Sequence, residues 1–420
     1  MFRRKILSLF LVFALLFVLV LNLVGCSRKI DATDLMAGIE PRASVGAPGT
    51  LSETSVAAAA DFALRLYRES YDGSNTLLSP LSVFVALAMT ANGANGNTKT
   101  EMESVLGLSV PDLNEFCALY LNSLTGNDDV KLALANSIWL RDTENFAVKQ
   151  AFLQTNADVY GAGAFRAPFN ASTVKDVNQW VKDHTDGMID KIVDGFTSDD
   201  MMLLINALVF DAKWASPYTL DTQVRSGDFH LENGTAERVK FLLGSEYRYL
   251  TDGDRAVGFV KPYVGGRYAF AALLPSEGTP VADYVASLTG ETVISILKNA
   301  QYVSVETEMP KFETEYKIVL NDALSEMGMT DAFDPDAADF SGITESFPMF
   351  WIDEVLHKTC IEVGEKGTRA AAVTSVRGKA LSAAPEETVP PVILDRPFVY
   401  LIFDTVTNLP LFIGTLNDPS

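Results

Sequence analysis

The pattern of apolar positions changes along the chain from helical spacing to the short runs typical of strands. Over residues 52–69, apolar side chains recur every three or four positions, which predicts a helix. Similar patterns predict helices over 81–90 and 172–186, the second with its valines on one face. Runs typical of strands dominate later, at 132–140, 203–210, 256–261, 268–274, 302–308, 392–394 and 399–403.

This order of elements predicts the fold class. Helices come early, strands come late and both occur in the middle, which favours an α+β fold with large, mainly antiparallel sheets. No linker or internal repeat interrupts residues 53–420. We therefore expect one domain there, although the length alone would allow two or more.

The first 26 residues have the layout of an export signal. Arg3, Arg4 and Lys5 precede an apolar run over 6–24, which fits a signal peptide and is also long enough to span a bilayer as an uncleaved anchor. The sequence Leu-Val-Gly-Cys at 23–26 resembles a bacterial lipobox, in which Cys26 is acylated and becomes the first residue of the mature chain. An uncleaved helix with a chance cysteine is the alternative. Both interpretations place residues 27–420 outside the inner membrane.

The segment after the signal lacks a regular pattern. Residues 27–52 are poor in large apolar side chains and rich in Ala, Gly, Pro, Ser, Thr and Asp. We interpret them as a flexible tether. The expected organisation is a lipoprotein signal peptide over 1–25, the lipidated Cys26 and a tether over 26–52, and a globular domain over 53–420. The mature chain would be a lipoprotein at the cell surface or facing the periplasm.

Composition excludes several classes of protein. The 420 residues are 48% hydrophobic and 21% charged, which is typical of a globular chain and not of a disordered or collagen-like one. The formal net charge of −21 opposes binding to nucleic acid, because such binding depends on Lys and Arg that neutralise phosphates. Three cysteines and three histidines support neither a disulfide framework nor a metal centre, so we expect no cofactor.

Motifs for catalysis are missing as well. The sequence contains no GxSxG, no HExxH, no Walker loop and no GxGxxG after a strand. Cys360 lies close to His357 in sequence, which raises the possibility of a thiol nucleophile with its base. In a strand these two side chains would point to opposite faces, because their positions differ in parity. We therefore do not expect an enzyme.

One segment is informative about function. The sequence Glu-Lys-Gly-Thr-Arg-Ala-Ala-Ala-Val-Thr at 365–374 follows a strand-like run and resembles the hinge of the reactive loop of the serpins. Other motifs match the same family in the same order, at 75–82 with 86–89, 93–98 with 101–102, 204–207 through 213–214, 274–278, 309–312, and 396–398 through 411–414. The resemblance covers almost the whole domain. It implies a serpin-like fold, with several helices around large sheets and an exposed reactive loop.

The loop sequence is compatible with insertion into a sheet. A strand that inserts must bury one face, so its side chains should sort with period two. From Thr368 to Ala380 the even positions carry no charge, and the charges of Arg369, Arg377 and Lys379 all fall on odd positions. We therefore favour an inhibitor over a non-inhibitory serpin that acts as a binding module. A solvated surface loop without such a role is the other alternative.

The resemblance also implies where a protease would cut. Counting from the hinge glutamate places the scissile bond between Leu381 and Ser382, and leucine suits chymotrypsin-like or elastase-like proteases. Arg377 and Lys379 are the competing positions for a trypsin-like protease. The mechanism implied is suicide inhibition, in which a serine protease is trapped as a covalent acyl-enzyme. The hinge residues are Glu365, Gly367, Thr368, Ala370, Ala371 and Ala372.

Further positions match supporting residues of the family. Ser82, Asn206 and His357 match the shutter, a hydrogen-bonded group that holds the central sheet closed. Lys311 matches the partner of Glu365 in an ion pair at the breach, where the loop enters the sheet, with Trp214 packed beside it. The expected partners are a serine protease and, through the lipid on Cys26, a membrane. Nucleic acid is not expected, and the protein should be a monomer.

Overall fold

The computed structural model describes residues 30–42, 49–124, 129–143, 146–344, 350–368 and 389–419. Ala32–Ser420 cluster into one compact unit, so the body begins well before the predicted start at residue 53. The predicted signal peptide and Cys26 lie outside the described residues. Among the helices that are described, none is both long and apolar enough to cross a membrane.

A seven-stranded sheet forms the centre of this unit. Its strands, in spatial order, are β1 (Thr33–Asp34), β4 (Gly163–Ala167), β3 (Val130–Arg141), β5 (Met202–Lys213), β14 (Gly367–Thr368), β13 (Glu354–Val363) and β12 (Phe312–Val319). Most neighbours are antiparallel, whereas β4 runs parallel to β3 and β13 runs parallel to β5. The prediction of large, mainly antiparallel sheets is confirmed, and these two parallel pairings are the exceptions in the central sheet.

Two further sheets complete the β-structure. The six-stranded sheet contains β2 (Leu77–Leu78), β17 (Pro410–Leu416), β16 (Phe398–Asp404), β10 (Tyr268–Pro275), β9 (Ala256–Pro262) and β8 (Tyr249–Thr251). The four-stranded sheet contains β15 (Val392–Ile393), β11 (Val305–Pro310), β7 (Ala236–Glu246) and β6 (Val224–His230). Strands β9, β10, β16 and β17 are almost entirely buried, which explains their continuous apolar runs.

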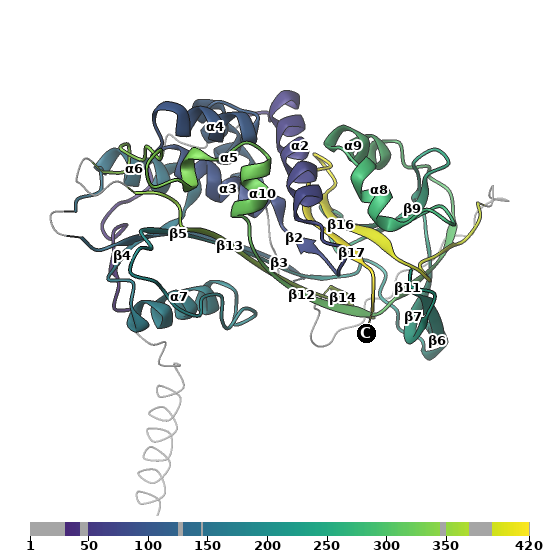
Figure 1. Ribbon diagram of the computed structural model, residues 1–420. Helices are drawn as coiled ribbons and strands as arrows, with labels where there is room; N and C mark the ends of the chain where they lie inside the picture. Colours follow the sequence, from purple (N-terminus) through teal and green to yellow (C-terminus); the bar gives the residue numbers. More distant parts are fainter. Residues whose placement is uncertain are drawn as a thin grey trace, which may run out of the picture. The chain divides into compact units, whose positions relative to one another are not determined.

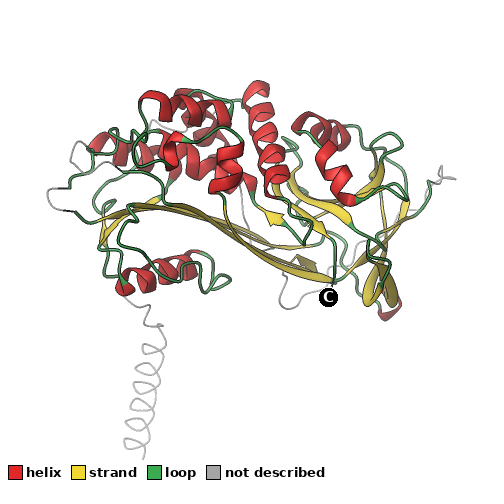
Figure 2. Ribbon diagram, viewed as in Figure 1, coloured by secondary structure: helices red, strands yellow, loops and turns green. Residues whose placement is uncertain are grey.

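Helices cover both faces of the central sheet (Figure 1). The helices α2 to α5 and α10 lie on one face, and α7 lies on the other, as the colours of Figure 2 make plain. The α-helices of the described residues are α2 (Glu53–Ser70), α3 (Pro80–Ala91), α4 (Gly96–Leu106), α5 (Val110–Ser123), α6 (Gln150–Thr155), α7 (Ala171–His184), α8 (Val281–Ser287), α9 (Gly290–Lys298) and α10 (Asn321–Glu326). The predicted helices over 52–69, 81–90 and 172–186 correspond to α2, α3 and α7.

Helix α3 is the helix that brings polar groups to the centre of the sheet. All of its residues are buried, because it lies between the sheet and the other helices. Pro80 occupies its first position, where the missing N–H costs no intrahelical hydrogen bond. Ser79 and Ser82, at the beginning of this helix, are therefore placed beside the sheet. The backbone N–H of Ser79 donates to His357 of β13, and the hydroxyl of Ser82 donates to Asn206 of β5.

The segment predicted as a tether is in part packed on the body. Thr33 and Asp34 pair antiparallel with Arg166 and Phe165 of β4. The side chains of Leu35, Met36 and Ile39 pack against the hydrophobic core, and Arg42 forms an ion pair with Asp158. The prediction for this part of 26–52 was wrong, because a short strand can dock through main-chain hydrogen bonds that leave no periodic pattern in the sequence.

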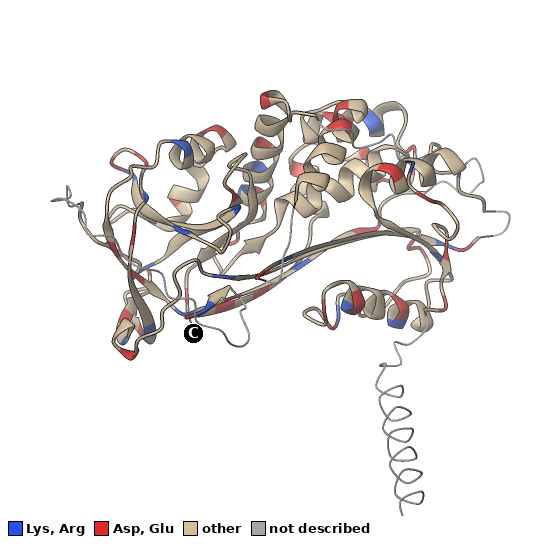
Figure 3. Cartoon of the chain, turned by 180° about the vertical axis from the view of Figure 1, so that it is seen from behind, with Lys and Arg blue, Asp and Glu red and all other residues tan. Residues whose placement is uncertain are grey.

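Charged residues are dispersed over the surface. Figure 3 shows Asp and Glu on helices and loops throughout the unit, with Lys and Arg interspersed among them. Several of the basic side chains are engaged in ion pairs with these acids. The excess of negative charge is thus a property of the whole surface and not of one acidic site.

Candidate functional site

The central sheet is closed at one end and split at the other. Strands β5 and β13 pair in parallel from Leu203 to Ala207 and from Glu354 to Lys358. Farther along, β14 lies between them, with Thr368 opposite both Ala212 of β5 and Val363 of β13. Residues 208–211 of β5 lie between these two pairings. Two residues of the hinge, Gly367 and Thr368, are therefore already a strand inside the sheet.

Glycine is required at the first position of β14. A Cβ atom on Gly367 would lie 2.0 Å from the carbonyl oxygen of Ala212 and 2.8 Å from the Cα of Lys213. Both are backbone atoms of β5 and cannot turn away as a side chain could. The close approach of these two strands therefore depends on the absence of a side chain at Gly367.

Thr368 faces the core side of the sheet, as its even parity predicted. Its side chain is buried, and its hydroxyl lies 2.5 Å from the hydroxyl of Tyr263. Tyr263 is itself buried and stacks on Trp214 with a centroid distance of 4.5 Å. Burial raises the pKa of Tyr263, so its hydroxyl keeps its proton and can serve as donor or acceptor to Thr368.

The turn before β14 is held through its main-chain carbonyl groups. The indole N–H of Trp214 donates to the carbonyl of Gly364 at 2.8 Å, and its backbone N–H donates to the carbonyl of Lys366 at 2.9 Å. The backbone N–H of Tyr218 donates to the carbonyl of Glu365 at 2.9 Å. Three consecutive carbonyl groups of this turn are thus bound by one short segment, 214–218, at the end of β5.

The predicted ion pair at the breach is present. The Nζ of Lys311 lies 2.8 Å from Oε1 of Glu365. The hydrogen bond from Lys311 lowers the pKa of Glu365, so this carboxylate is ionised at neutral pH. Both side chains are more than a third exposed, and exposed pairs of this kind contribute about 0–1 kcal/mol. The pair therefore fixes the geometry of the turn more than it adds to stability.

The three residues expected at the shutter are brought together. Ser82 donates to Oδ1 of Asn206 at 2.6 Å, and Nδ1 of His357 lies 2.7 Å from the same oxygen. The backbone N–H of Ser79 donates to Nε2 of His357 at 3.0 Å, and the amide of Asn206 donates to Asn136 at 2.8 Å. Because Nε2 accepts a hydrogen bond, the proton of the neutral ring is on Nδ1 and points to Asn206.

Several residues of this site were not singled out from the sequence. Ser79 and Asn136 extend the shutter, and Tyr218 and Tyr263 extend the breach. Asn136 could have been found, because together with Ser137 it interrupts the apolar middle of this strand. The two tyrosines gave no such signal, since their roles arise from contacts between segments far apart in the chain.

The remaining predicted positions fall into two groups. Ala370, Ala371, Ala372, Leu381 and Ser382 lie outside the described residues. His357 is fully buried, whereas Cys360 is partly exposed, as expected for opposite faces of β13. No group of His, Cys, Asp and Glu among the described residues could hold a metal ion.

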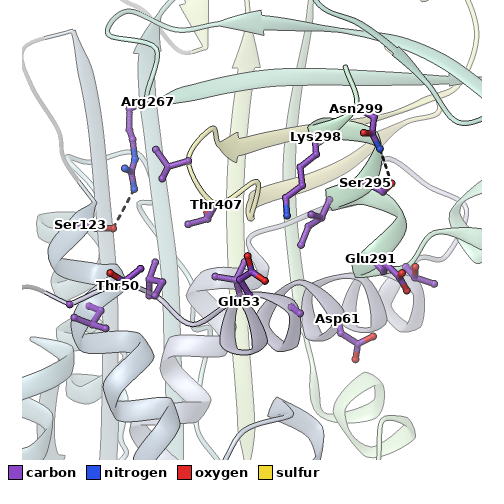
Figure 4. Close-up of a pocket in the computed structure, with 18 residues that line it drawn as sticks. Thr50, Glu53, Asp61, Ser123, Arg267, Glu291, Ser295, Lys298, Asn299 and Thr407 are labelled. Atoms are coloured by element: carbon purple, nitrogen blue, oxygen red, sulfur yellow. Dashed lines mark hydrogen bonds between the residues drawn. The ribbon is translucent and has the colours of Figure 1, made fainter. Parts of the chain in front are cut away.

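A cavity of about 1090 Å³ lies apart from the hinge (Figure 4). Residues of α2, α5 and α9 and of the connection between β16 and β17 line it. Within it, Arg267 donates to the hydroxyl of Ser123, and Lys298 and Glu53 extend from α9 and α2. None of the hinge, shutter or breach residues borders this cavity, so it is not part of the site described above.

The chain is similar to known proteins over most of its length. Residues 57–419 match the family Serpin (serine protease inhibitor). An uncharacterised serpin-like protein of Thermococcus kodakarensis is 32% identical over 368 residues, which cover 85% of this chain and 84% of that protein. Leukocyte elastase inhibitor A of Mus musculus is 30% identical over 378 residues, which cover 85% of this chain and 97% of that protein.

A solved structure gives the same result for the fold. The thermophilic serpin Tengpin in its native state superposes with a TM-score of 0.86 at 42% sequence identity, and the match covers 92% of this chain and 99% of that one. The fold predicted from the sequence is confirmed by this likeness.

The shutter predicts a dependence of stability on pH. Burial lowers the pKa of His357 to about 3, against about 6.5 for an exposed histidine. Below pH 6.5 the unfolded chain binds a proton at His357 that the folded chain does not bind. The free energy of unfolding therefore falls progressively from pH 6.5 down to pH 3. At pH 5 we expect a loss of about 2 kcal/mol relative to pH 7.5.

The measurement is denaturant unfolding of the wild type and of His357→Gln at both pH values. The variant should lose less stability between pH 7.5 and 5 than the wild type. Asp353, whose pKa is raised by burial to about 6, changes stability in the opposite direction but does so equally in both proteins. Equal losses in the two proteins would contradict the assignment to His357.

Proposed function

The chain belongs to the serpin family, whose members generally inhibit serine proteases, and we propose that it is an irreversible suicide inhibitor of such proteases. The observation that carries the proposal is the position of β14 between β5 and β13. The hinge has begun to form the strand that inhibition would complete. The protein would act as an inhibitor without turnover of its own, and as a monomer.

The mechanism proceeds from cleavage to insertion. The protease serine attacks the carbonyl carbon of Leu381, the bond to Ser382 breaks, and the amine of Ser382 leaves with the proton that the protease histidine supplies. The loop, still joined to the protease through the acyl bond, then inserts as a strand. Displacement of the bound protease distorts its active site before water can hydrolyse the ester.

The register of β14 supports this account. In the antiparallel pairing with β5, continuation from Thr368 would place Ala370 opposite Phe210 and Ala372 opposite Leu208. These even positions face the core side, where Thr368 is already buried. Arg369 would lie opposite Asp211, on the other face. A charge at position 369 is therefore compatible with insertion, because an opposite charge lies across from it.

The registers of β14 with its two neighbouring strands place the same residue of the inserted chain beside the shutter. The pairing of β14 with β5 would bring Thr374 opposite Asn206, and its pairing with β13 would bring the same residue opposite His357. Asn206 and His357 are themselves partners in the present sheet. Insertion would thus replace one parallel pairing by two antiparallel ones, which are slightly more stable per residue.

The first experiment detects inhibition and locates the cleaved bond. The chain from residue 32 onward is incubated with chymotrypsin, elastase, trypsin and subtilisin. We expect a complex with chymotrypsin or elastase that survives boiling in detergent, and a released fragment that begins at Ser382 by mass spectrometry. A fragment that begins at Gly378 or Ala380 would move the bond to Arg377 or Lys379 and favour a trypsin-like target. Cleavage without a complex, and without a gain in thermal stability, would favour a non-inhibitory serpin that acts as a binding module.

A second experiment tests insertion by parity. Thr368→Arg would place an unpaired charge on the buried face and should lower the yield of covalent complex about tenfold or more, while cleavage continues. Ala371→Arg is the matched control, because position 371 has the outward parity, and it should retain most of the yield. A normal yield from Thr368→Arg would contradict the insertion mechanism.

We also propose that the protein is exported and anchored to a membrane by a lipid on Cys26. The charged and apolar segments before Cys26 and the lipobox-like sequence at 23–26 support this proposal. In a bacterial host expressing the full chain, radioactive palmitate should label the wild type, and Cys26→Ser should abolish the label. Equal labelling of Cys117→Ser would show that the buried thiol is irrelevant, and labelling that persists in Cys26→Ser would contradict the anchor.

A further inference from the structure

A buried lysine, Lys261, contacts segment 214–218, which binds the turn before β14. The side chain of Lys261 on β9 is 2% exposed, and its Nζ lies 2.7 Å from Oε1 of Glu246 at the end of β7, which is 7% exposed. Burial raises the pKa of Glu246, and the attraction of Lys261 opposes that rise. An ion pair at such depth is seldom more stabilising than two apolar side chains of the same size. We therefore ask which neighbouring residues the ion pair of Lys261 and Glu246 holds in position.

The ammonium group makes its other contacts with one short segment. The Nζ of Lys261 donates to the carbonyl oxygen of Ser216 at 3.1 Å. It lies 4.4 Å from the ring centroid of Tyr218 and 5.4 Å from that of Trp214, both within the range of cation–π attraction. One charged atom thus contacts the first, the middle and the last residue of segment 214–218.

The same segment supplies the hydrogen bonds that hold the hinge. Trp214 donates twice and Tyr218 donates once to the three carbonyl groups of residues 364–366. A hydrogen bond weakens steeply when its donor moves by an ångström or turns away from the acceptor. The positions of these donors depend on the shape of segment 214–218. Lys261 is a buried charged group that contacts three residues of that segment, in addition to the main-chain hydrogen bond from Ala215 to Pro262.

We propose that Lys261 and Glu246 are positioning residues for the hinge. Glu246 holds the ammonium group of Lys261 in place, and the ammonium group holds segment 214–218 in the conformation that binds residues 364–366. The register in which β14 begins is thereby set before any protease arrives. The effect on inhibition rests on the proposed function, whereas the effect on the hinge hydrogen bonds does not.

The test measures amide hydrogen exchange of the intact protein by mass spectrometry, in the peptide that covers residues 214–218. Lys261→Met removes the ammonium group but leaves Glu246 buried without its partner, so this variant could fail to fold. The double variant Lys261→Met, Glu246→Leu removes both charges and keeps the site filled. In the double variant we expect exchange in this peptide to be about tenfold faster or more, with a global stability equal to or above that of the wild type.

A matched control separates positioning from general destabilisation. Leu106→Ala removes a buried side chain at the end of α4 and should lower the global stability without faster exchange at 214–218 under native conditions. Exchange in the double variant that equals that of the wild type would overturn the proposal. An equal increase of the exchange rate in Leu106→Ala would also overturn it, because exchange in this peptide would then depend only on the global stability.

The effect on inhibition is measured separately, as the yield of cleaved chain that carries no protease. If the wild type forms a covalent complex, the double variant should yield several-fold more cleaved, uncomplexed chain, because a poorly placed hinge inserts more slowly than the acyl bond is hydrolysed. A wild type that forms no complex would refute the proposed function, yet the exchange measurement would still decide whether Lys261 positions the hinge.

Discussion

The seam between β5 and β13 is the constraint on which the rest of the structure depends. These strands lie side by side in parallel over a short stretch that ends at Ala207 and Lys358, and the sheet is split beyond it. The seam is held by main-chain hydrogen bonds and by the buried group around Asn206. In a medium of low dielectric constant such a group stabilises the sheet most when every member is satisfied. Here the amide nitrogen of Asn136 and the hydroxyl of Ser79 are buried without a hydrogen-bond partner among the described residues, so the group holds the closed sheet less firmly than a complete network would.

The turn before β14 is bound largely through its main chain. Segment 214–218 binds the carbonyl groups of 364–366, which every amino acid possesses, so the identity of Lys366 matters little to this contact. The next two positions are constrained for different reasons. Gly367 is fixed by the backbone of β5, and Thr368 is fixed by a buried space that ends at the hydroxyl of Tyr263. The requirement for particular side chains thus falls on Gly367 and Thr368, in addition to the ion pair of Glu365 with Lys311.

Much of this architecture could be predicted from the sequence, and the failures have physical causes. Helices α2, α3 and α7 and the buried strands were predicted, because their apolar spacing records the face that they bury. The strand predicted over 302–308 is observed as Val305–Pro310, since apolar content alone does not define where pairing begins. Parity correctly placed Thr368 inside and separated His357 from Cys360. Lys261 could not be identified, because a lysine in a strand is ordinarily exposed and only the folded chain surrounds it with Glu246, Trp214 and Tyr218.

The docked segment near the N-terminus has a further consequence, for association between molecules. The outer edge of a sheet presents unpaired main-chain groups to any strand that approaches, which makes it a site of aggregation. At one edge of the central sheet, β1 covers Phe165 and Arg166 of β4. At the other edge, β12 exposes Glu313, Glu315 and Lys317, whose charges oppose pairing with a second chain. The two edges are thus protected by different means, one by the chain itself and one by charge, so that the sheet can open internally without inviting a neighbour at its rims.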